Sequence, residues 1–284
     1  MLGLDAHPRS VHNEVVPTLG DFHYLEAMPG PQARQRGVLV LLHAFPVNAR
    51  MWEGQLALAE RGWHVVAPQF RGFDAAGEQE GRMSLPTVDD YAGDVIDLLD
   101  ALHVRHAVIG GLSMGGYVAF AVFRHAARYV QGLVLADTKA TADTSEAIEG
   151  RQRMLTLVRS SGAGAVADEM IPKLLGDTTR KTRPDIVERV RSLATSNSSD
   201  AIAGAIHVLM TRPDSTPLLA TIHVPTVIIV GDEDTVTPRA AAEEMQRGIS
   251  GSTLATIPAA GHLSNLEQTP AFNAVLAAFL DSRV

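Results

Sequence analysis

Six short apolar runs, rich in β-branched residues, constrain the fold of this chain more than any other feature. They cover residues 38–42, 64–68, 106–111, 130–136, 226–231 and 253–258. Their hydrophobicity is continuous rather than alternating, which is typical of strands buried on both faces of a parallel sheet. Residues 89–104 instead repeat apolar side chains at helical spacing. Residues 117–129 are apolar nearly all round, which predicts a helix packed on the sheet, and residues 271–284 should form a C-terminal helix that opens after Pro270. We therefore expect an α/β fold with a mostly parallel central sheet covered by helices.

One region interrupts this alternation of strands and helices. Residues 138–212 contain no such run, and they are rich in Arg, Ser, Asp and Ala with apolar positions at helical spacing. This pattern predicts a helical cap, or lid, inserted between two strands. The core domain then comprises residues 1–137 and 213–284, and the cap domain residues 138–212. A purely structural helical subdomain is the alternative interpretation.

Composition excludes several functional classes. The chain has 284 residues, 46% of them hydrophobic, and a formal net charge of −8, which disfavours binding to nucleic acid or to an anionic membrane surface. It has no cysteine, so disulfides and thiolate catalysis are excluded. The N-terminus lacks the pattern of a secretory signal, and no stretch reaches the ~18 apolar residues of a membrane span. We expect a cytoplasmic protein, either a monomer or a small homo-oligomer.

The stretch GGLSMGG, residues 110–116, surrounds one serine with four glycines. A flexible linker is one interpretation, but this stretch joins a predicted buried strand to a predicted buried helix. The pattern G-x-S-x-G centred on Ser113 instead predicts a sharp strand-to-helix turn, in which glycines remove collisions between neighbouring side chains. Such a turn presents the hydroxyl at a helix N-terminus, where free N–H groups stabilise an anion. Ser113 is therefore a candidate nucleophile.

A serine hydroxyl needs a base, and the base needs an orienting acid. The run at 226–231 is followed by three acidic residues, Asp232, Glu233 and Asp234, and His262 comes just after the last run. The resulting order along the chain is serine, acid, histidine, which is the order of α/β-hydrolases.

Motifs along most of the chain extend this similarity. They are LLHAFP, FRGFDAAG, GGLSMGGYVAF, LADT, EMIPKLLG, RPDST, GDEDTVTP and AGHLSNLEQTP, and they lie within residues 20–282. With these motifs the chain resembles the α/β-hydrolase superfamily. It is similar in particular to small bacterial carboxylesterases and to hydrolases of the 3-oxoadipate enol-lactonase type. The resemblance implies an α/β-hydrolase fold with a cap.

The resemblance also implies roles for individual residues. The family's G-x-x-D pattern makes Asp234 the acid and leaves Asp232 as a turn cap. Asp137, directly after the run at 130–136, is a third candidate acid, with holding the cap entrance as its alternative role. The match of AGH-x-x-x-x-E-x-P to the family's histidine loop makes His262 the base and gives Glu267 the task of bracing that loop.

Ester hydrolysis also requires two N–H donors for the oxyanion. Met114, the residue after the nucleophile, should supply one. By resemblance to the family's H-G-x-P loop, Phe45 supplies the other, and His43 holds that loop. Ala44 replaces the usual glycine, which is tolerable if its backbone φ stays negative. No cofactor or metal is expected, because the chain lacks clustered metal-ligand spacing and the lysine of a phosphate loop.

These residues predict a serine hydrolase that cleaves small, short-chain carboxylic esters through an acyl-enzyme. Lactone hydrolysis and cofactor-free perhydrolysis are alternatives that use the same triad. A small-molecule receptor with a hydrolase fold is the non-enzyme alternative. The expected partner is a small ester, for which four apolar cap residues are candidate contacts, although packing between cap helices explains them equally well. They are Met154, Met170, Ile171 and Met210.

Overall fold

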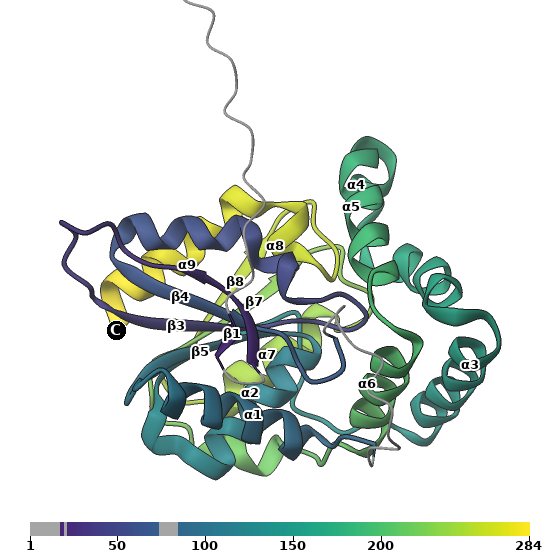
Figure 1. Cartoon of the computed structure of the whole chain (residues 1–284), viewed down its shortest axis with the longest axis horizontal. Helices are drawn as coiled ribbons and strands as arrows, with labels where there is room; N and C mark the ends of the chain where they lie inside the picture. Colours follow the sequence, from purple (N-terminus) through teal and green to yellow (C-terminus); the bar gives the residue numbers. More distant parts are fainter. Residues whose placement is uncertain (1–17, 20–21, 74–84) are drawn as a thin grey trace, which may run out of the picture.

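The computed structural model describes residues 18–19, 22–73 and 85–284. Its centre is a sheet in the order β1-β2-β4-β3-β5-β6-β7-β8 (Figure 1). The strands from β3 onward are mutually parallel, while β2 runs antiparallel to β4 and β1 antiparallel to β2. The expected α/β fold with a mostly parallel sheet is confirmed. The strands are β1 (Thr18–Leu19), β2 (Phe22–Ala27), β3 (Gly37–Leu42), β4 (Trp63–Pro68), β5 (Ala107–Leu112), β6 (Val130–Ala136), β7 (Thr226–Gly231) and β8 (Thr253–Ile257).

Burial explains the continuous hydrophobicity of the central strands. Every residue of β4, β5 and β7 is buried, because helices cover both faces of the sheet. The two N-terminal strands were not predicted. In β2 only the two central residues are buried, so its sequence carries no continuous apolar run.

Two helical layers enclose the sheet (Figure 1). One contains α1 (Val88–Ala101), α2 (Met114–Ala126) and α7 (Arg239–Gly248); the other contains the 3₁₀-helix η1 (Ala49–Arg61), α8 (Ser264–Glu267) and α9 (Thr269–Arg283). Two further 3₁₀ turns are η2 (Ala127–Tyr129) and η3 (Thr216–Thr221). Helix α2 begins three residues earlier than predicted, because the serine turn leads directly into it. Among the described residues, no helix is both long and apolar enough to cross a bilayer.

Four helices are inserted between β6 and β7 and lie beyond one edge of the sheet (Figure 1). They are α3 (Ser145–Leu174), α4 (Asp177–Thr182), α5 (Pro184–Thr195) and α6 (Ser199–Thr211). Helix α3 is interrupted at Gly162, whose φ of 78° lies in the left-handed region that glycine adopts without a steric penalty. The helical insertion within residues 138–212 is confirmed. The division into separate core and cap domains stays a prediction.

Candidate active site

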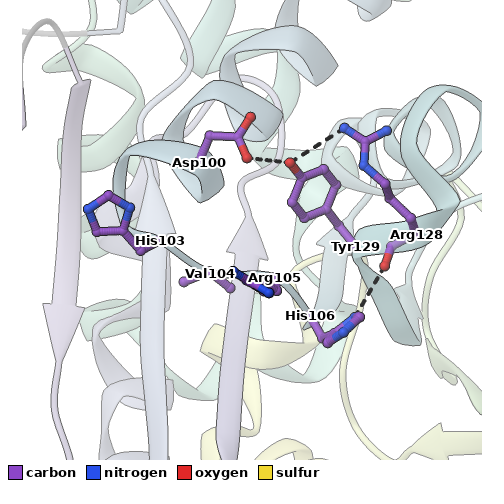
Figure 2. A pocket seen from close by; sticks show the side chains of 7 residues that line it. All are labelled: Asp100, His103, Val104, Arg105, His106, Arg128 and Tyr129. Atoms are coloured by element: carbon purple, nitrogen blue, oxygen red, sulfur yellow. Dashed lines mark hydrogen bonds between the residues drawn. The ribbon is translucent and has the colours of Figure 1, made fainter.

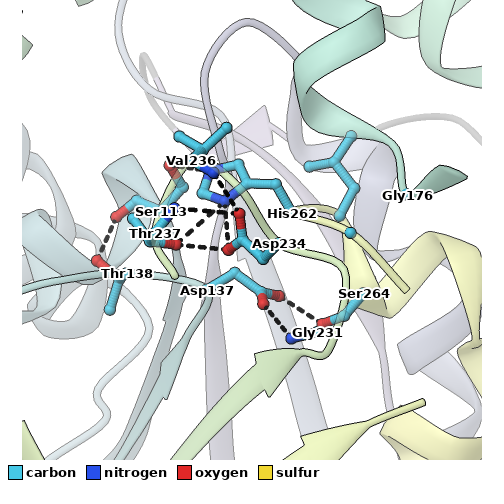
Figure 3. Close-up of polar contacts among 12 residues, drawn as sticks. Ser113, Asp137, Thr138, Gly176, Gly231, Asp234, Val236, Thr237, His262 and Ser264 are labelled. Atoms are coloured by element: carbon cyan, nitrogen blue, oxygen red, sulfur yellow. Dashed lines mark hydrogen bonds and ion pairs between the residues drawn. The ribbon is translucent and has the colours of Figure 1, made fainter. Parts of the chain in front are cut away.

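The parallel sheet brings three predicted site residues to one edge. Ser113 follows β5, Asp234 lies three residues beyond β7, and His262 lies in the loop after β8. The carboxyl ends of parallel strands meet at the same edge, which is where α/β proteins form their sites. Figure 3 shows the imidazole of His262 in contact with both other side chains.

The serine turn has the strained geometry that its glycines indicate. Ser113 has φ 55° and ψ −112°, values that a non-glycine residue rarely adopts. A Cβ atom on Gly111 would lie 2.1 Å from the carbonyl oxygen of Gly115. A Cβ atom on Gly115 would lie 2.1 Å from the carbonyl oxygen of Leu42, at the end of β3. Only glycine therefore fits at these two positions.

His262 links the serine to an aspartate. Its Nε2 atom lies 2.8 Å from Ser113 Oγ, and its Nδ1 atom lies 2.9 Å from Asp234 Oδ2. An ionised carboxylate only accepts hydrogen bonds, so Nδ1 carries the proton and donates it to Asp234. Nε2 is then free to accept the hydrogen bond from Ser113. The imidazole is only 1% exposed, so bulk water does not compete for these bonds.

Asp234 is held as a carboxylate by several donors. Oδ1 accepts from the backbone N–H groups of Val236 (2.8 Å) and Thr237 (3.0 Å), and Oδ2 accepts from Thr237 Oγ1 (2.6 Å). Burial raises the pKa of Asp234, but the charge of His262 and the hydrogen bonds from His262 and Thr237 outweigh it and leave the pKa below its usual value. Asp232 is exposed, and its carboxylate faces the N–H of Ala260 at 3.4 Å rather than His262. Sequence analysis had missed Thr237, although it follows Asp234 by three residues.

Asp137, the third candidate acid, does not contact the imidazole. Its Oδ1 atom accepts from the N–H of Gly231 at 2.8 Å, and its other oxygen is hydrogen-bonded to Ser264 Oγ. These partners belong to the loops after β7 and β8, so the expectation that Asp137 holds the cap entrance is wrong.

His43 lies in the loop after β3 and is neutral. Its Nε2 atom accepts from the N–H of Phe70 (3.2 Å), and its Nδ1 atom faces the carbonyl of Ala44 (3.1 Å). Burial lowers the pKa of His43 to about 4, because a charged imidazolium would be desolvated there. Ala44 is not among the described residues with positive φ. In the described part of the chain, the N–H groups of Phe45 and Met114 donate to no protein acceptor.

Glu267 braces the histidine loop. Its carboxylate accepts from the N–H groups of Gly261 (2.9 Å) and Gly176 (2.8 Å), so it joins this loop to the segment between α3 and α4. The N–H of His262 also donates to the carbonyl of Leu174 at 2.9 Å. One side of the cap is therefore anchored on the loop that carries His262.

A second anchor joins the cap to the loop after β3. Asn197, just beyond the end of α5, donates from Nδ2 to the carbonyl of Pro46 at 2.8 Å. Asn48 donates from its own Nδ2 to Asn197 Oδ1 at 3.0 Å. Both asparagines are buried, and sequence analysis had missed both because their partners lie some 150 residues apart in the chain.

The four candidate substrate contacts lie within or against the hydrophobic core. Met154, Met170 and Ile171 are buried, and Met210 is partly buried and packs against the same cluster. Contact with a substrate stays a prediction for all four.

The structure also contains a hollow of about 650 Å³, and Figure 2 shows the side chains that line it. It is lined by Asp100, His103, Val104, Arg105, His106, Arg128 and Tyr129. These residues lie around the beginning of β5, whereas Ser113 follows its end. A six-residue strand spans roughly 20 Å, so this hollow belongs to the opposite edge of the sheet. In the parts of the chain that the structure describes, no group of three or more His, Asp or Glu side chains is arranged to hold a metal ion.

The chain is similar in sequence and structure to known hydrolases and related proteins. The sequence pattern of the alpha/beta hydrolase family matches residues 39–275. A thermophilic esterase from Thermogutta terrifontis, solved with malate bound, is 34% identical with a TM-score of 0.84, covering 92% of this chain and 93% of that one. 3-Oxoadipate enol-lactonase 2 of Acinetobacter baylyi is 29% identical over 238 residues, 84% of this chain and 86% of that protein. A putative non-heme chloroperoxidase of a Synechocystis species is 27% identical over 257 residues, 85% of this chain and 90% of that protein.

The chain belongs to the alpha/beta hydrolase family, as the resemblance of its motifs predicted. Its Ser113, His262 and Asp234 are arranged as in a serine hydrolase.

Proposed function

We propose that this protein is a carboxylesterase that cleaves small, short-chain carboxylic esters through an acyl-enzyme on Ser113. One observation carries the proposal: the imidazole of His262 is hydrogen-bonded to Ser113 Oγ at 2.8 Å and to Asp234 at 2.9 Å. The left-handed backbone of Ser113 supports it, because such strain at a single polar residue is typical of a functional site.

In the first half-reaction, Ser113 Oγ attacks the ester carbonyl while its proton moves to His262 Nε2. Asp234 stabilises the imidazolium that forms. The tetrahedral oxyanion is held by the N–H groups of Phe45 and Met114, which have no protein acceptor in the described structure. The intermediate collapses, the bond to the alcohol oxygen breaks, and His262 gives its proton to the leaving alcohol.

The second half-reaction frees the acid. Water loses a proton to His262 Nε2 as it attacks the acyl carbon, and the oxyanion returns to the same two N–H groups. The bond to Ser113 Oγ then breaks and His262 reprotonates the serine. The net reaction consumes one water and yields one acid and one alcohol.

Lactone hydrolysis is the second candidate, and the enol-lactonase relative favours it. A lactone is an internal ester, so Ser113 would open it by the same steps, with the alcohol remaining on the acyl chain. Perhydrolysis, suggested by the chloroperoxidase relative, would replace water with peroxide in the second half-reaction.

The test measures turnover on p-nitrophenyl esters from acetate to long acyl chains, with lactones alongside. We expect the highest kcat/KM at short acyl chains, and a loss of at least ~10³-fold in Ser113→Ala. Asp234→Asn should lower kcat by as much as ~10⁴-fold, because it disturbs the tautomer and charge of His262. Asp232→Asn is the matched control on the same loop and should leave turnover unchanged.

Retained activity in Ser113→Ala would defeat the nucleophile assignment. Equal loss in both aspartate variants would defeat the acid assignment. Faster turnover of lactones than of every ester would favour the second candidate. Turnover far below one per minute on every substrate would support a receptor instead.

A further inference from the structure

The end of β6 contacts all three loops that carry the triad, although it contributes no member of it. The carbonyl of Ala136 accepts from the N–H of Ser113 at 3.0 Å, and Thr138 Oγ1 donates to the carbonyl of Ser113 at 2.8 Å. Between them, the side chain of Asp137 reaches away from the serine and toward the other two loops (Figure 3). These three residues therefore lie at the centre of the site's framework.

The two hydrogen-bond partners of Asp137 lie close in the chain to Asp234 and His262. Gly231 precedes Asp234 by three residues, and Ser264 follows His262 by two. The carboxyl group of Asp137 is hydrogen-bonded to both, at 2.8 Å from the N–H of Gly231 and directly to Ser264 Oγ. Asp234 and His262 must stay within hydrogen-bond reach of each other, and one buried side chain connects their two loops.

The backbone of Asp137 is itself held in a costly conformation. Its φ is 43°, in the left-handed region that a non-glycine residue adopts only at a steric cost. Its N–H donates to the carbonyl of Ile229 at 2.8 Å, and the residue is buried, with 1% of its surface exposed. The surrounding contacts therefore fix the direction of this carboxyl group.

We propose that Asp137 is a positioning residue: its carboxyl group ties the loop of Asp234 to the loop of His262 and so keeps the imidazole aligned with Ser113. This inference rests on the proposed function, because it assigns Asp137 to the same triad.

The surroundings of Asp137 disfavour a negative charge on its carboxyl group. Burial raises its pKa well above the usual range, and the negative charges of Asp234 and Glu267 raise it further, against the hydrogen bonds from Ser264 and Gly231. Asp234 has more donors and the imidazole beside it, so the site stabilises a negative charge better at Asp234 than at Asp137. The carboxyl group of Asp137 accepts from the N–H of Gly231 at Oδ1 and from Ser264 Oγ at Oδ2. The task that we propose for Asp137 is to join the two loops, and a negative charge is not part of it.

Two substitutions at position 137 distinguish the effect of the hydrogen bonds to Gly231 and Ser264 from the effect of a charge on Asp137. Asp137→Asn has an uncharged side chain that can keep both contacts: its Oδ1 accepts from Gly231, and its Nδ2 donates to Ser264 Oγ once that hydroxyl turns to accept. We therefore expect kcat on p-nitrophenyl acetate within about 3-fold of wild type and an unchanged pH profile of kcat/KM. Asp137→Ala removes the tie, and a displacement of the imidazole by about 1 Å costs up to ~10²-fold in kcat. KM should stay near its wild-type value, because the side chain of Asp137 contacts Gly231 and Ser264 rather than Ser113. Ser264→Ala removes one of the two hydrogen bonds of Asp137 and should lower kcat as well, but by less than Asp137→Ala does.

The control is Asp232→Ala, which removes an exposed carboxylate from the same loop as Asp234. The rate of Ser113 labelling by a fluorophosphonate provides a readout that needs no turnover. If wild-type protein neither hydrolyses esters nor reacts with the probe, the proposed function fails. If it labels and Asp137→Ala labels at the same rate, only the present inference fails.

Two other results would overturn it. Asp137→Asn could shift the acidic limb of the pH profile by a full pH unit, which would mean that Asp137 acts through its charge. Ser264→Ala and Asp137→Asn could both fold and show equal kcat losses, which would mean that the hydrogen-bonded tie is not what matters. If Asp137→Ala does not fold, these two variants still decide the question.

Discussion

Replacing Gly115 with alanine tests whether the serine turn and the loop after β3 are held in place by direct contact. Gly115 lies in the first turn of α2, two residues after Ser113. A Cβ atom there would lie 2.1 Å from the carbonyl oxygen of Leu42, a backbone atom that cannot rotate away. Leu42 is the last residue of β3 and immediately precedes the loop of Phe45. Gly115→Ala therefore forces apart Ser113, the proposed nucleophile, and Phe45, a proposed oxyanion donor.

Two opposing effects set the magnitude. Gly→Ala in a helix is favourable by up to about 1 kcal/mol, because alanine loses less backbone entropy on folding. Overpacking in a dense interior costs typically 1–3 kcal/mol and occasionally more. Relief of the contact requires the two backbones to separate by roughly 1 Å, and a displacement of that size in a catalytic site can cost ~10²-fold in rate. We expect Gly115→Ala to destabilise by about 1–3 kcal/mol and to lower kcat by about 10²-fold.

The matched control is Gly93→Ala, in helix α1, where a Cβ atom would meet nothing within 4 Å. That variant should gain about 0.5–1 kcal/mol and keep full activity. Urea unfolding followed by the fluorescence of the buried Trp52 and Trp63 gives the stability of each variant, and p-nitrophenyl acetate hydrolysis gives kcat. If Gly115→Ala is as stable and as active as Gly93→Ala, the close contact between α2 and β3 does not exist in solution.

Two further predictions concern the loop after β3. Burial lowers the pKa of His43 to about 4, so between pH 6.5 and 4 the folded protein binds fewer protons than the unfolded chain. Wild type should therefore lose up to about 3 kcal/mol of stability as the pH falls through that window, a loss that His43→Gln should not show. Acid-unfolding curves that run parallel for the two proteins would contradict this. Asn197→Ala removes the donor to the buried carbonyl of Pro46 and should cost about 1–3 kcal/mol in urea unfolding. The control Gln246→Ala, on the exposed face of α7, should change stability by less than about 0.5 kcal/mol. Equal effects of the two substitutions would mean that the cap anchor contributes nothing.

The parallel strands could be predicted because their signal is local. Each of the strands β3 to β8 is a short apolar run that can be recognised from its own residues alone. Strand β2 could not be found in this way, because only Tyr24 and Leu25 are buried in it and its pairing with β4 depends on tertiary contacts. The start of α2 was missed for a related reason: Gly115 and Gly116 are poor helix formers, and packing against β3 and Thr138 requires them.

The same distinction applies to the site. Ser113 and His262 lie in motifs whose neighbours explain them, and Asp234 was predicted from its resemblance to a G-x-x-D pattern, with Asp232 and Asp137 as alternatives. The residues that hold the site in place are different in kind. Thr237, Ser264 and Asn197 are common polar residues, and nothing in their local sequence indicates which distant atom they contact. Their roles arise from side-chain hydrogen bonds between loops, which only the folded chain brings together.

Asp137 and Asp234 show most clearly what sequence cannot decide. Both follow adjacent parallel strands, both are buried, and either could orient a histidine. What separates them is the number of donors at each carboxyl group. Asp234 receives two backbone N–H groups, a hydroxyl and the imidazole, whereas Asp137 receives one backbone N–H and one hydroxyl. Two neighbouring buried carboxylates cannot both ionise cheaply, so the negative charge is favoured at Asp234, which has more donors and which we propose orients His262. Burial and the charge of Asp234 raise the pKa of Asp137, whose carboxyl group braces the loops instead.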